Sequence, residues 1–257
     1  METIKRAIKT VFTFRFKPSW DLAVVLASTI LVTASLYIAT AVITPAKGGG
    51  MPYFFMYAGA TALLFGICLP LFWTVVVRKR SLQDLGITRK NLGLSLGLQV
   101  ILAAIQFALT LGKAPLPPFE KLLPLIGLSL AIGFFEAIFW RGWVFQRIEE
   151  SFGYLPAIIL GSALYALYHI GYTMPFSEIS FLFWIGVLYA VSFSITRSMF
   201  ILWPLYQPLG QLVTLTRDGL SLPLIASLGF IEALAVMIIA IWLAGKYAAK
   251  RQKKALV

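Results

Sequence analysis

Long apolar runs separated by short polar loops constrain this chain more than any other feature. About 20 helical residues cross the roughly 30 Å hydrocarbon core of a bilayer, and eight runs of about that length fill most of the 257 residues. Only 12% of residues are charged, and the mean hydropathy is +0.87, whereas soluble domains carry about twice that charged fraction. The sequence therefore predicts an all-α polytopic membrane protein, an eight-helix transmembrane bundle. Its spans are predicted over residues 21–44, 52–77, 92–112, 122–146, 154–171, 179–196, 199–215 and 222–244.

Basic residues divide unequally between the two sides of this predicted bundle. With the N-terminus in the cytoplasm, 17 of the 22 Lys and Arg residues fall in inner segments, four fall in outer loops, and Arg141 lies within a span. Cytoplasmic loops of membrane proteins carry the excess of Lys and Arg, so both termini are predicted to be cytoplasmic. The net charge of +12 is thus interpreted as orienting helices. We expect membrane lipids as partners and no nucleic acid.

A single transmembrane domain is predicted over residues 1–257, because no soluble domain, low-complexity tract or clear internal repeat interrupts the spans. Residues 1–20 mix basic and aromatic side chains, which suits either a segment lying at the headgroup surface or a tail that only sets orientation. No cleavable signal peptide is expected, since the first apolar run is long enough to span. Cys68 is the only cysteine, so no disulfide framework is predicted.

Three ionisable residues lie in the mainly apolar stretch from Gly133 to Gly171: Glu136, Arg141 and His169, the only histidine. A charge in the hydrocarbon costs on the order of 3 kcal/mol, and such a residue marks a functional site by default. At helical rise, Glu136 and His169 lie about 15 and 22 Å from the cytoplasmic ends of their spans, so they can meet near mid-membrane. A carboxylate beside an imidazole can deprotonate a water. A buried Glu–His hydrogen bond joining two helices is the simpler alternative.

Two glutamines share one face of the predicted seventh span. Gln207 and Gln211 are four residues apart, and Pro208 between them should kink the helix. Their amides can either donate hydrogen bonds to a developing oxyanion or join neighbouring helices.

The remaining polar residues allow alternative interpretations. Arg141 does not share a clean α-helical face with Glu136, and it can also extend to the inner headgroups. Tyr165, Tyr168 and Tyr172 surround His169 in the sequence and can either line a site or take part in its chemistry. Glu232 is predicted to be a second buried carboxylate, either paired with Arg141 or protonated.

Together these residues resemble the CPBP family of intramembrane proteases, which includes the CAAX prenyl endopeptidases and the bacteriocin-immunity Abi proteins. The family motifs are Glu-Glu-x-x-x-Arg, Phe-x-x-x-His and His-x-x-x-Asn or Asp. Here residues 136–141 read EAIFWR, residues 165–169 read YALYH, and residues 207–211 read QPLGQ. The basic lead-in SLQDLGITRKNLG also resembles the family, and a family-like core is predicted over residues 80–215.

The resemblance implies an endopeptidase that hydrolyses a peptide bond of a membrane-anchored peptide or protein substrate. Glu136 and His169 would activate the attacking water. Gln207, Gln211, Arg141 and Tyr165 would serve the oxyanion or the substrate. The expected location is the plasma membrane of a prokaryote.

Two departures from the motifs keep other functions open. Ala137 replaces the second glutamate and Gln207 replaces the third-motif histidine, so a catalytically inactive membrane scaffold is the first alternative. A proton-coupled carrier using Glu136, His169 and Glu232 is the second, although the internal repeats usual in carriers are not seen. One histidine and one carboxylate are fewer than the three protein ligands of a catalytic zinc, so no cofactor is predicted. A divalent metal is the alternative, which the metalloprotease label often attached to the family suggests.

Overall fold

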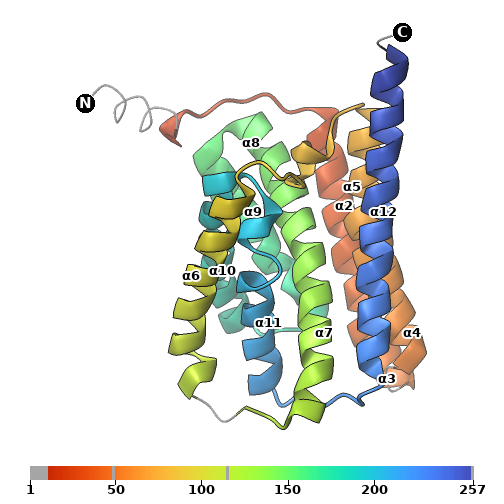
Figure 1. Ribbon diagram of the computed structural model, residues 1–257, viewed down its shortest axis with the longest axis vertical. Coiled ribbons are helices and arrows are strands. Elements are labelled where there is room, and N and C mark those ends of the chain that lie inside the picture. The colour runs from red at the N-terminus through yellow and green to blue at the C-terminus, as the bar shows by residue number, and fades with distance from the viewer. Residues whose placement is uncertain (1–10, 48–49, 114–115, 256–257) are drawn as a thin grey trace.

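The computed structural model describes residues 11–47, 50–113 and 116–255, and the ordered elements of these residues are all helices. Within them, seven helical segments are long and apolar enough to cross a membrane, and they run side by side in one bundle (Figure 1). The predicted helical membrane bundle is confirmed, and the predicted count of eight spans is not. The seven segments are Trp20–Ile43, Gly50–Val77, Leu92–Leu109, Phe119–Phe152, Tyr154–Tyr172, Phe176–Thr196 and Ala226–Gln252.

Four of the seven segments change helical type along their length. Trp20–Ile43 joins α2 (Trp20–Tyr37) to the π-helix η1 (Ile38–Ile43). Gly50–Val77 joins α4 (Gly50–Phe54), the π-helix η2 (Phe55–Cys68), α5 (Leu69–Leu71) and the π-helix η3 (Phe72–Val77). Phe119–Phe152 joins α7 (Phe119–Glu136), the π-helix η6 (Ala137–Phe145) and α8 (Gln146–Phe152). Tyr154–Tyr172 joins α9 (Tyr154–Leu167) to the 3-10 helix η7 (Tyr168–Tyr172). The other elements are α3 (Thr44–Lys47), η4 (Leu82–Leu85), α6 (Leu92–Leu109), η5 (Leu111–Lys113), α10 (Phe176–Thr196), η8 (Met199–Ile201), α11 (Tyr206–Arg217) and α12 (Ala226–Ala255).

The segment predicted as the seventh span is broken. Its only long helix is α11, whose 12 residues extend about 18 Å, too short for a 30 Å hydrocarbon core. Pro204 lies before α11 and Pro208 in its first turn, where the missing N–H costs no helical hydrogen bond. α11 fills the lower half of the bundle between α6 and α7 (Figure 1). At the other end, the Met199 N–H donates to the Gly86 carbonyl at 2.9 Å. Between Met199 and Arg217 the chain therefore still crosses from one end of the bundle to the other. The helix α2 begins at the same end of the bundle at which α12 finishes.

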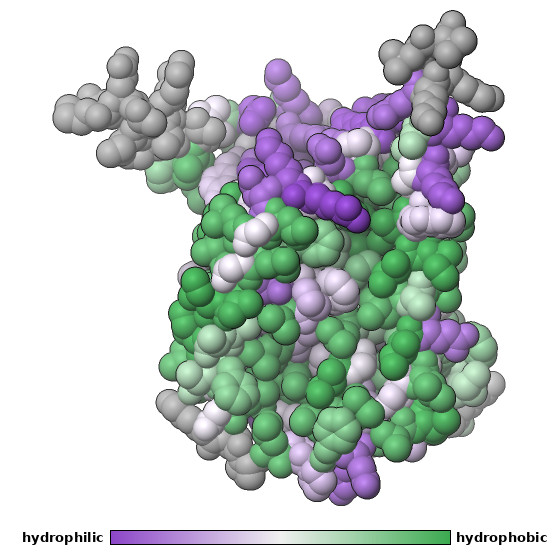
Figure 2. Space-filling view, viewed as in Figure 1, coloured by the Kyte–Doolittle hydropathy of each residue, from purple (hydrophilic) through white to green (hydrophobic). Residues whose placement is uncertain are grey.

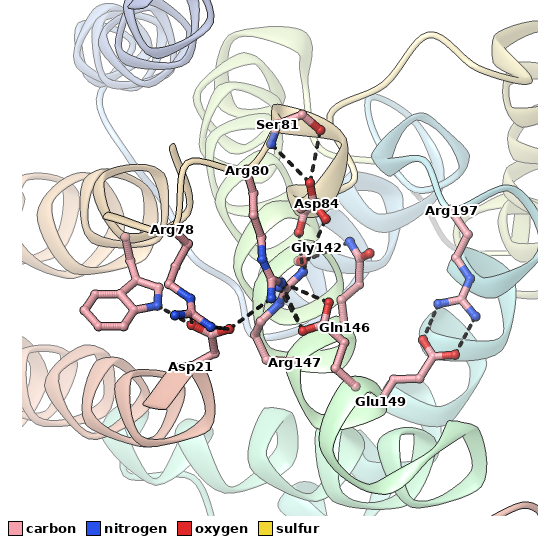
Figure 3. Close-up of polar contacts among 12 residues, drawn as sticks. Asp21, Arg78, Arg80, Ser81, Asp84, Gly142, Gln146, Arg147, Glu149 and Arg197 are labelled. Atoms are coloured by element: carbon pink, nitrogen blue, oxygen red, sulfur yellow. Dashed lines mark hydrogen bonds and ion pairs between the residues drawn. The ribbon is translucent and has the colours of Figure 1, made fainter. Parts of the chain in front are cut away.

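Ion pairs fasten that end of the bundle around one buried carboxylate (Figure 3). Asp21, in the first turn of α2, accepts a 2.7 Å hydrogen bond from Trp73 Nε1 and pairs with Arg78 Nε at 2.8 Å. Arg80 connects Asp21 to Glu150 of α8, at 3.2 and 3.0 Å. These contacts join the start of α2, the loop after η3 and α8, so the segment that carries Glu136 is held at its polar end.

A second set of contacts ties α8 to its neighbours. Arg147 is buried, pairs with Glu150 at 3.0 Å and donates to the Asp84 carbonyl at 3.1 Å. Glu149 binds the Arg197 guanidinium at the end of α10, and hydrogen bonding to that carboxylate raises the pKa of Arg197. Hydrophilic side chains gather at this end, whereas hydrophobic ones cover the sides of the bundle (Figure 2).

The described part of the predicted interfacial segment lies against the end of α8 and the start of α9. The N–H groups of Arg15 and Lys17 donate to the carbonyls of Phe152 and Ser151 at 3.1 and 2.9 Å. The Phe12, Phe14 and Phe16 side chains are exposed, as a segment at the headgroup level requires. Its first ten residues lie outside the described residues, and its contact with headgroups stays a prediction.

Because Gly133 has no side chain, α11 can approach α7 closely. A Cβ added to Gly133 would lie 2.7 Å from Pro208 Cγ, which is closer than van der Waals contact allows. Pro208 follows Gln207 directly, and Gly133 precedes Glu136 by one helical turn. This close approach therefore places the start of α11 beside the end of α7.

We expect Gly133→Val to lower the stability of the bundle by about 1–3 kcal/mol, because overpacking must push α11 away from α7. Thermal unfolding of the detergent-solubilised protein measures the effect. Gly97→Val in α6 is the matched control, since a Cβ at Gly97 would meet nothing within 4 Å. Equal melting temperatures for the two variants would show that this approach is not a tight contact.

Candidate functional site

Three separate elements meet at Glu136. The residue ends α7, directly before the π-helix η6, and its side chain is fully buried. Gln207 and Gln211 come from α11, and Tyr168 begins the 3-10 helix η7. The change from α-helix to π-helix after Glu136 and the change from α-helix to 3-10 helix at Tyr168 thus both occur at the site. Such irregular turns are frequent at functional positions.

The Glu136 carboxylate accepts three hydrogen bonds. Gln207 Nε2 and Gln211 Nε2 donate to Oε2 at 2.8 and 2.9 Å, and the Tyr168 hydroxyl donates to Oε1. A carboxylate has about four lone-pair positions, so one acceptor position remains open. The structure brings Glu136 together with both predicted glutamines, and the three donors supply the internal partners that a buried carboxyl group needs.

His169 lies beside this carboxylate network and joins it through Tyr168. The His169 ring is buried, and its centroid lies 4.3 Å from that of Tyr168. Its Nδ1 lies 2.9 Å from the Tyr165 carbonyl oxygen. A carbonyl oxygen only accepts, so Nδ1 carries the proton and Nε2 is left as the unprotonated nitrogen.

Tyr168 is the site residue that the sequence named only as one of three tyrosines around His169. The sequence favoured Tyr165 as the tyrosine of the site, but the Tyr165 ring packs against His169 and Arg141, and Tyr168 binds Glu136. The only available signal was that Tyr168 directly precedes the single histidine. Which of several tyrosines on one helical turn reaches a carboxylate depends on the 3-10 geometry of η7, which the sequence does not reveal.

Arg141 is fully buried and does not extend to headgroups, so that interpretation was wrong. Its guanidinium carbon lies 4.9 Å from the centroid of the Tyr165 ring, a cation–π distance. None of its three nitrogens has a hydrogen-bond partner among the described residues. Glu136 and Arg141 nevertheless interact electrostatically, because π-helical hydrogen bonding runs from residue i to i+5 and brings residues five apart toward one face. Arg141 therefore supplies positive potential near Glu136 without a direct bond.

Glu232 is not part of this site. Its side chain is exposed on the outer side of α12, so the predicted burial of this residue was wrong. The reason is the position of α12, which packs at the edge of the bundle, so that only 6% of its apolar membrane-spanning stretch is buried. A carrier pathway through Glu136, His169 and Glu232 gains no support from this arrangement.

The groups around Glu136 do not suit a metal cation. The two amides point their NH₂ groups at the carboxylate, and His169 Nδ1 faces a backbone carbonyl. Among the described residues, no group of three His, Cys, Asp or Glu side chains could hold a metal ion, and a catalytic zinc needs about that number of protein ligands. The prediction that the protein uses no metal stays a prediction.

The fold and the site define a polytopic membrane protein with a carboxylate and an imidazole buried among its helices. Residues 118–206 match the family described as Type II CAAX prenyl endopeptidase Rce1-like, which confirms the resemblance seen in the sequence. The match includes Glu136, Arg141 and His169 but ends one residue before Gln207. No curated protein and no solved structure matches the chain. The family match therefore covers α7 to α10 and does not reach the two glutamines of α11.

We expect Tyr168→Phe to destabilise the folded protein by about 1–3 kcal/mol, because it removes one donor from a buried carboxylate. Thermal unfolding in detergent measures the loss. Tyr247→Phe removes the same atom from an exposed side chain of α12 and should leave the melting temperature unchanged. If Tyr168→Phe has the same melting temperature as the parent, the Tyr168–Glu136 hydrogen bond contributes nothing to the stability of the folded protein.

Proposed function

We propose that this protein is an intramembrane endopeptidase of the CAAX type, which hydrolyses a peptide bond in a membrane-associated substrate. The observation that carries the proposal is the fully buried Glu136 carboxylate, which has three donors and one acceptor position left. A carboxylate in a hydrocarbon region is costly, and activation of a water gives it a use. The likeness of residues 118–206 to a protease family supports the same reaction class.

Glu136 is the proposed general base. A water bound at the open acceptor position would give a proton to the carboxylate while its oxygen attacks the carbonyl carbon of the scissile bond. The protonated Glu136 would then deliver that proton to the departing amine as the C–N bond breaks. His169 Nε2, the unprotonated ring nitrogen, would accept a hydrogen bond from the same water and orient it.

Gln207 and Gln211 are the proposed oxyanion donors. In the resting site both amides donate to Glu136. Once Glu136 takes up a proton it becomes a poorer acceptor, and the oxyanion of the tetrahedral intermediate becomes the better one. Gln211 is half-buried, whereas Glu136 and Gln207 are buried. Polar side chains also reach the surface between α6 and α7 at this level (Figure 2). The substrate would therefore approach from the side of Gln211.

We further propose that the end of the bundle bearing the Asp21 and Glu149 ion pairs faces the cytoplasm, in the plasma membrane of a prokaryotic cell. Most basic side chains lie in the segments at that end, and cytoplasmic segments are the ones enriched in Lys and Arg. Because α2 begins and α12 finishes at this end, both termini would be cytoplasmic.

Cysteine labelling in intact cells tests this orientation in a Cys68→Ser background. An impermeant maleimide added from outside should modify Ser221→Cys, in the exposed loop before α12, and should spare Lys90→Cys, in the exposed loop before α6. Both cysteines should react after the cells are permeabilised. Labelling of Lys90→Cys from outside would reverse the proposed topology.

A non-catalytic scaffold is the second candidate. The specific observation in its favour is that Glu136, Gln207, Gln211 and Tyr168 already bind one another, as polar groups that merely join helices would. Ala137, in place of a second carboxylate, leaves Arg141 without a hydrogen-bonded partner. A scaffold would bind a membrane-anchored peptide and leave it intact.

Glu136→Gln separates the two candidates without dismantling the site. The new amide oxygen can accept from Gln207 and Gln211, and its NH₂ can donate to the Tyr168 hydroxyl, so all partners stay satisfied. We therefore expect an unchanged or higher melting temperature, since a neutral amide is cheaper to bury than a charge. Cleavage should fall by at least the roughly 10²–10⁴-fold typical of general base catalysis.

The assay uses purified protein in liposomes and dye-labelled peptides anchored by a prenyl thioether or by one transmembrane helix. Gln211→Leu, which leaves one amide donor, should lose less activity than Glu136→Gln. Full cleavage by Glu136→Gln would exclude Glu136 as the base. If the parent binds these peptides and cleaves none of them, the scaffold is the better description.

A further inference from the structure

Three tyrosine hydroxyls follow one another away from the Glu136 carboxylate, and we call them the hydroxyl row. The Tyr168 hydroxyl donates to Glu136 Oε1 and lies 3.5 Å from the Tyr172 hydroxyl. The Tyr172 hydroxyl lies 2.6 Å from that of Tyr57. Tyr168 and Tyr172 are the first and last residues of η7, and Tyr57 belongs to η2. The proposed hydrolysis gives no role to Tyr172 or Tyr57.

The contact with Glu136 fixes the direction of every hydrogen bond in the hydroxyl row. A phenol has one proton to donate, and Tyr168 donates its proton to the carboxylate. The Tyr168 oxygen therefore accepts from Tyr172, and the Tyr172 oxygen accepts from Tyr57. The 3.5 Å contact is longer than an ideal O–H···O hydrogen bond, so a proton passes between Tyr168 and Tyr172 only when their hydroxyls move closer.

The hydroxyl row leads to the end of the bundle opposite the Asp21 and Glu149 ion pairs. The segment Tyr154–Tyr172 begins directly after α8, at the ion-paired end, and its 19 residues extend about 28 Å at helical rise. Tyr172, its last residue, is half-buried, and the next residue, Thr173, is exposed in the loop before α10. The Tyr172 hydroxyl is therefore the member of the row that lies nearest to bulk water.

Tyr168 is the one described donor to Glu136 that can readily lose and regain a proton. The other two donors are the amides of Gln207 and Gln211, which do not titrate. Toward the ion-paired end, all nine residues of η6 are buried. Its only ionisable side chain is Arg141, and a guanidinium has no acceptor and keeps its protons in proteins.

Other ionisable groups surround the carboxylate without continuing a path from it. The side chains that interact electrostatically with Glu136 come from η2, η6, α9, η7 and α10, and they are Tyr57, Arg141, Tyr165, Tyr168, Tyr172 and Tyr189. Among the described residues, Tyr168 is the only one of these that is hydrogen-bonded to the carboxylate. His169 lies beside the row, but its Nδ1 donates to the Tyr165 carbonyl oxygen.

We propose that the hydroxyl row is a proton route between Glu136 and the water at the end of the bundle opposite the ion pairs. Protonated Glu136 gives its proton to the Tyr168 oxygen, Tyr168 gives its own proton to Tyr172, and Tyr172 gives its own proton to water at the loop that begins with Thr173. Each hydroxyl gains one proton and loses one, so no charge remains in the row. Tyr57 is a positioning residue, because its hydrogen bond orients the Tyr172 hydroxyl.

The use of this route rests on the proposed peptidase function. Hydrolysis leaves a new carboxyl group in a site that bulk water does not reach. The new carboxyl group passes its proton to Glu136, and the hydroxyl row carries that proton to water. The site then holds a carboxylate product and an ionised Glu136, which can accept a proton from the next attacking water.

Infrared spectroscopy tests the route without any peptidase activity. After a rapid pH step, the C=O stretch of the protonated Glu136 carboxyl group is followed in detergent-solubilised protein, and Glu136→Gln identifies the band by its absence. We expect Tyr172→Phe to slow the change of this band roughly 10²-fold, the low end of what a positioned proton-transfer group contributes. Tyr57→Phe should slow it less.

Tyr53→Phe is the matched control. It removes the same atom from a ring stacked on Tyr57, and the Tyr53 hydroxyl has no hydrogen bond among the described residues, so the rate should stay unchanged. A Tyr172→Phe variant with the parent's melting temperature and the parent's rate would overturn the proposal, as would equal slowing by Tyr53→Phe. If Tyr172→Phe does not fold, Tyr57→Phe decides, and a rate equal to the parent's rejects the route.

Cleavage of the anchored peptides in sealed vesicles locates the end at which the route meets water. When only the external pH is changed, cleavage should respond in vesicles whose Tyr172 end faces outward and should not respond in inverted vesicles. The reverse pattern would contradict the proposed direction. If the parent cleaves none of the peptides, the peptidase function fails, and the infrared rates still decide whether the hydroxyl row carries protons.

Discussion

The hydrogen bonds to Glu136 are the interaction on which the functional part of this structure depends. In a bilayer no bulk water can satisfy a buried carboxylate, so its partners must come from the chain itself. The carboxylate and its partners belong to three elements far apart in sequence: α7 carries Glu136, η7 carries Tyr168, and α11 carries the two glutamines. The carboxylate therefore makes the relative placement of these elements energetically important. A displacement of α11 away from α7 would remove both amide donors at once, leaving Glu136 with the Tyr168 hydroxyl as its donor among the described residues and two amides unpaired.

The backbone accommodates this network by departing from regular α-helix. Gly133 lets Pro208 approach α7, and the change to π-helix after Glu136 brings Arg141 toward the carboxylate. At the end of α9, the 3-10 turn aims the Tyr168 hydroxyl at Glu136 and places the His169 ring against Tyr168. The ion pairs of Asp21 and Glu149 anchor the polar end of the same segments. The irregular turns η6 and η7 thus lie where a regular helix would have pointed a polar side chain elsewhere.

The helical bundle, most of its spans and the residues worth examining were predictable, because apolar run length and the cost of membrane charges are properties of the sequence alone. Glu136, Gln207 and Gln211 were selected on that basis, and they contact one another. Three features were not predictable. The broken segment predicted as the seventh span, residues 199–215, contains enough apolar residues to imitate a full helix. The π-helix changes which residues share a face, and Arg141 was judged by α-helical spacing. Glu232 was expected to be buried because hydropathy reports depth in the membrane and carries no information on which side of a helix faces protein.

The two carboxyl groups within the spans, Glu136 and Glu232, have different surroundings. Glu136 lies where helices converge, and the fold supplies its three donors. Glu232 lies on the least buried of the seven spans, and none of the described residues donates a hydrogen bond to it. The convergence of three elements, and not depth in the membrane alone, therefore distinguishes the surroundings of Glu136 from those of Glu232.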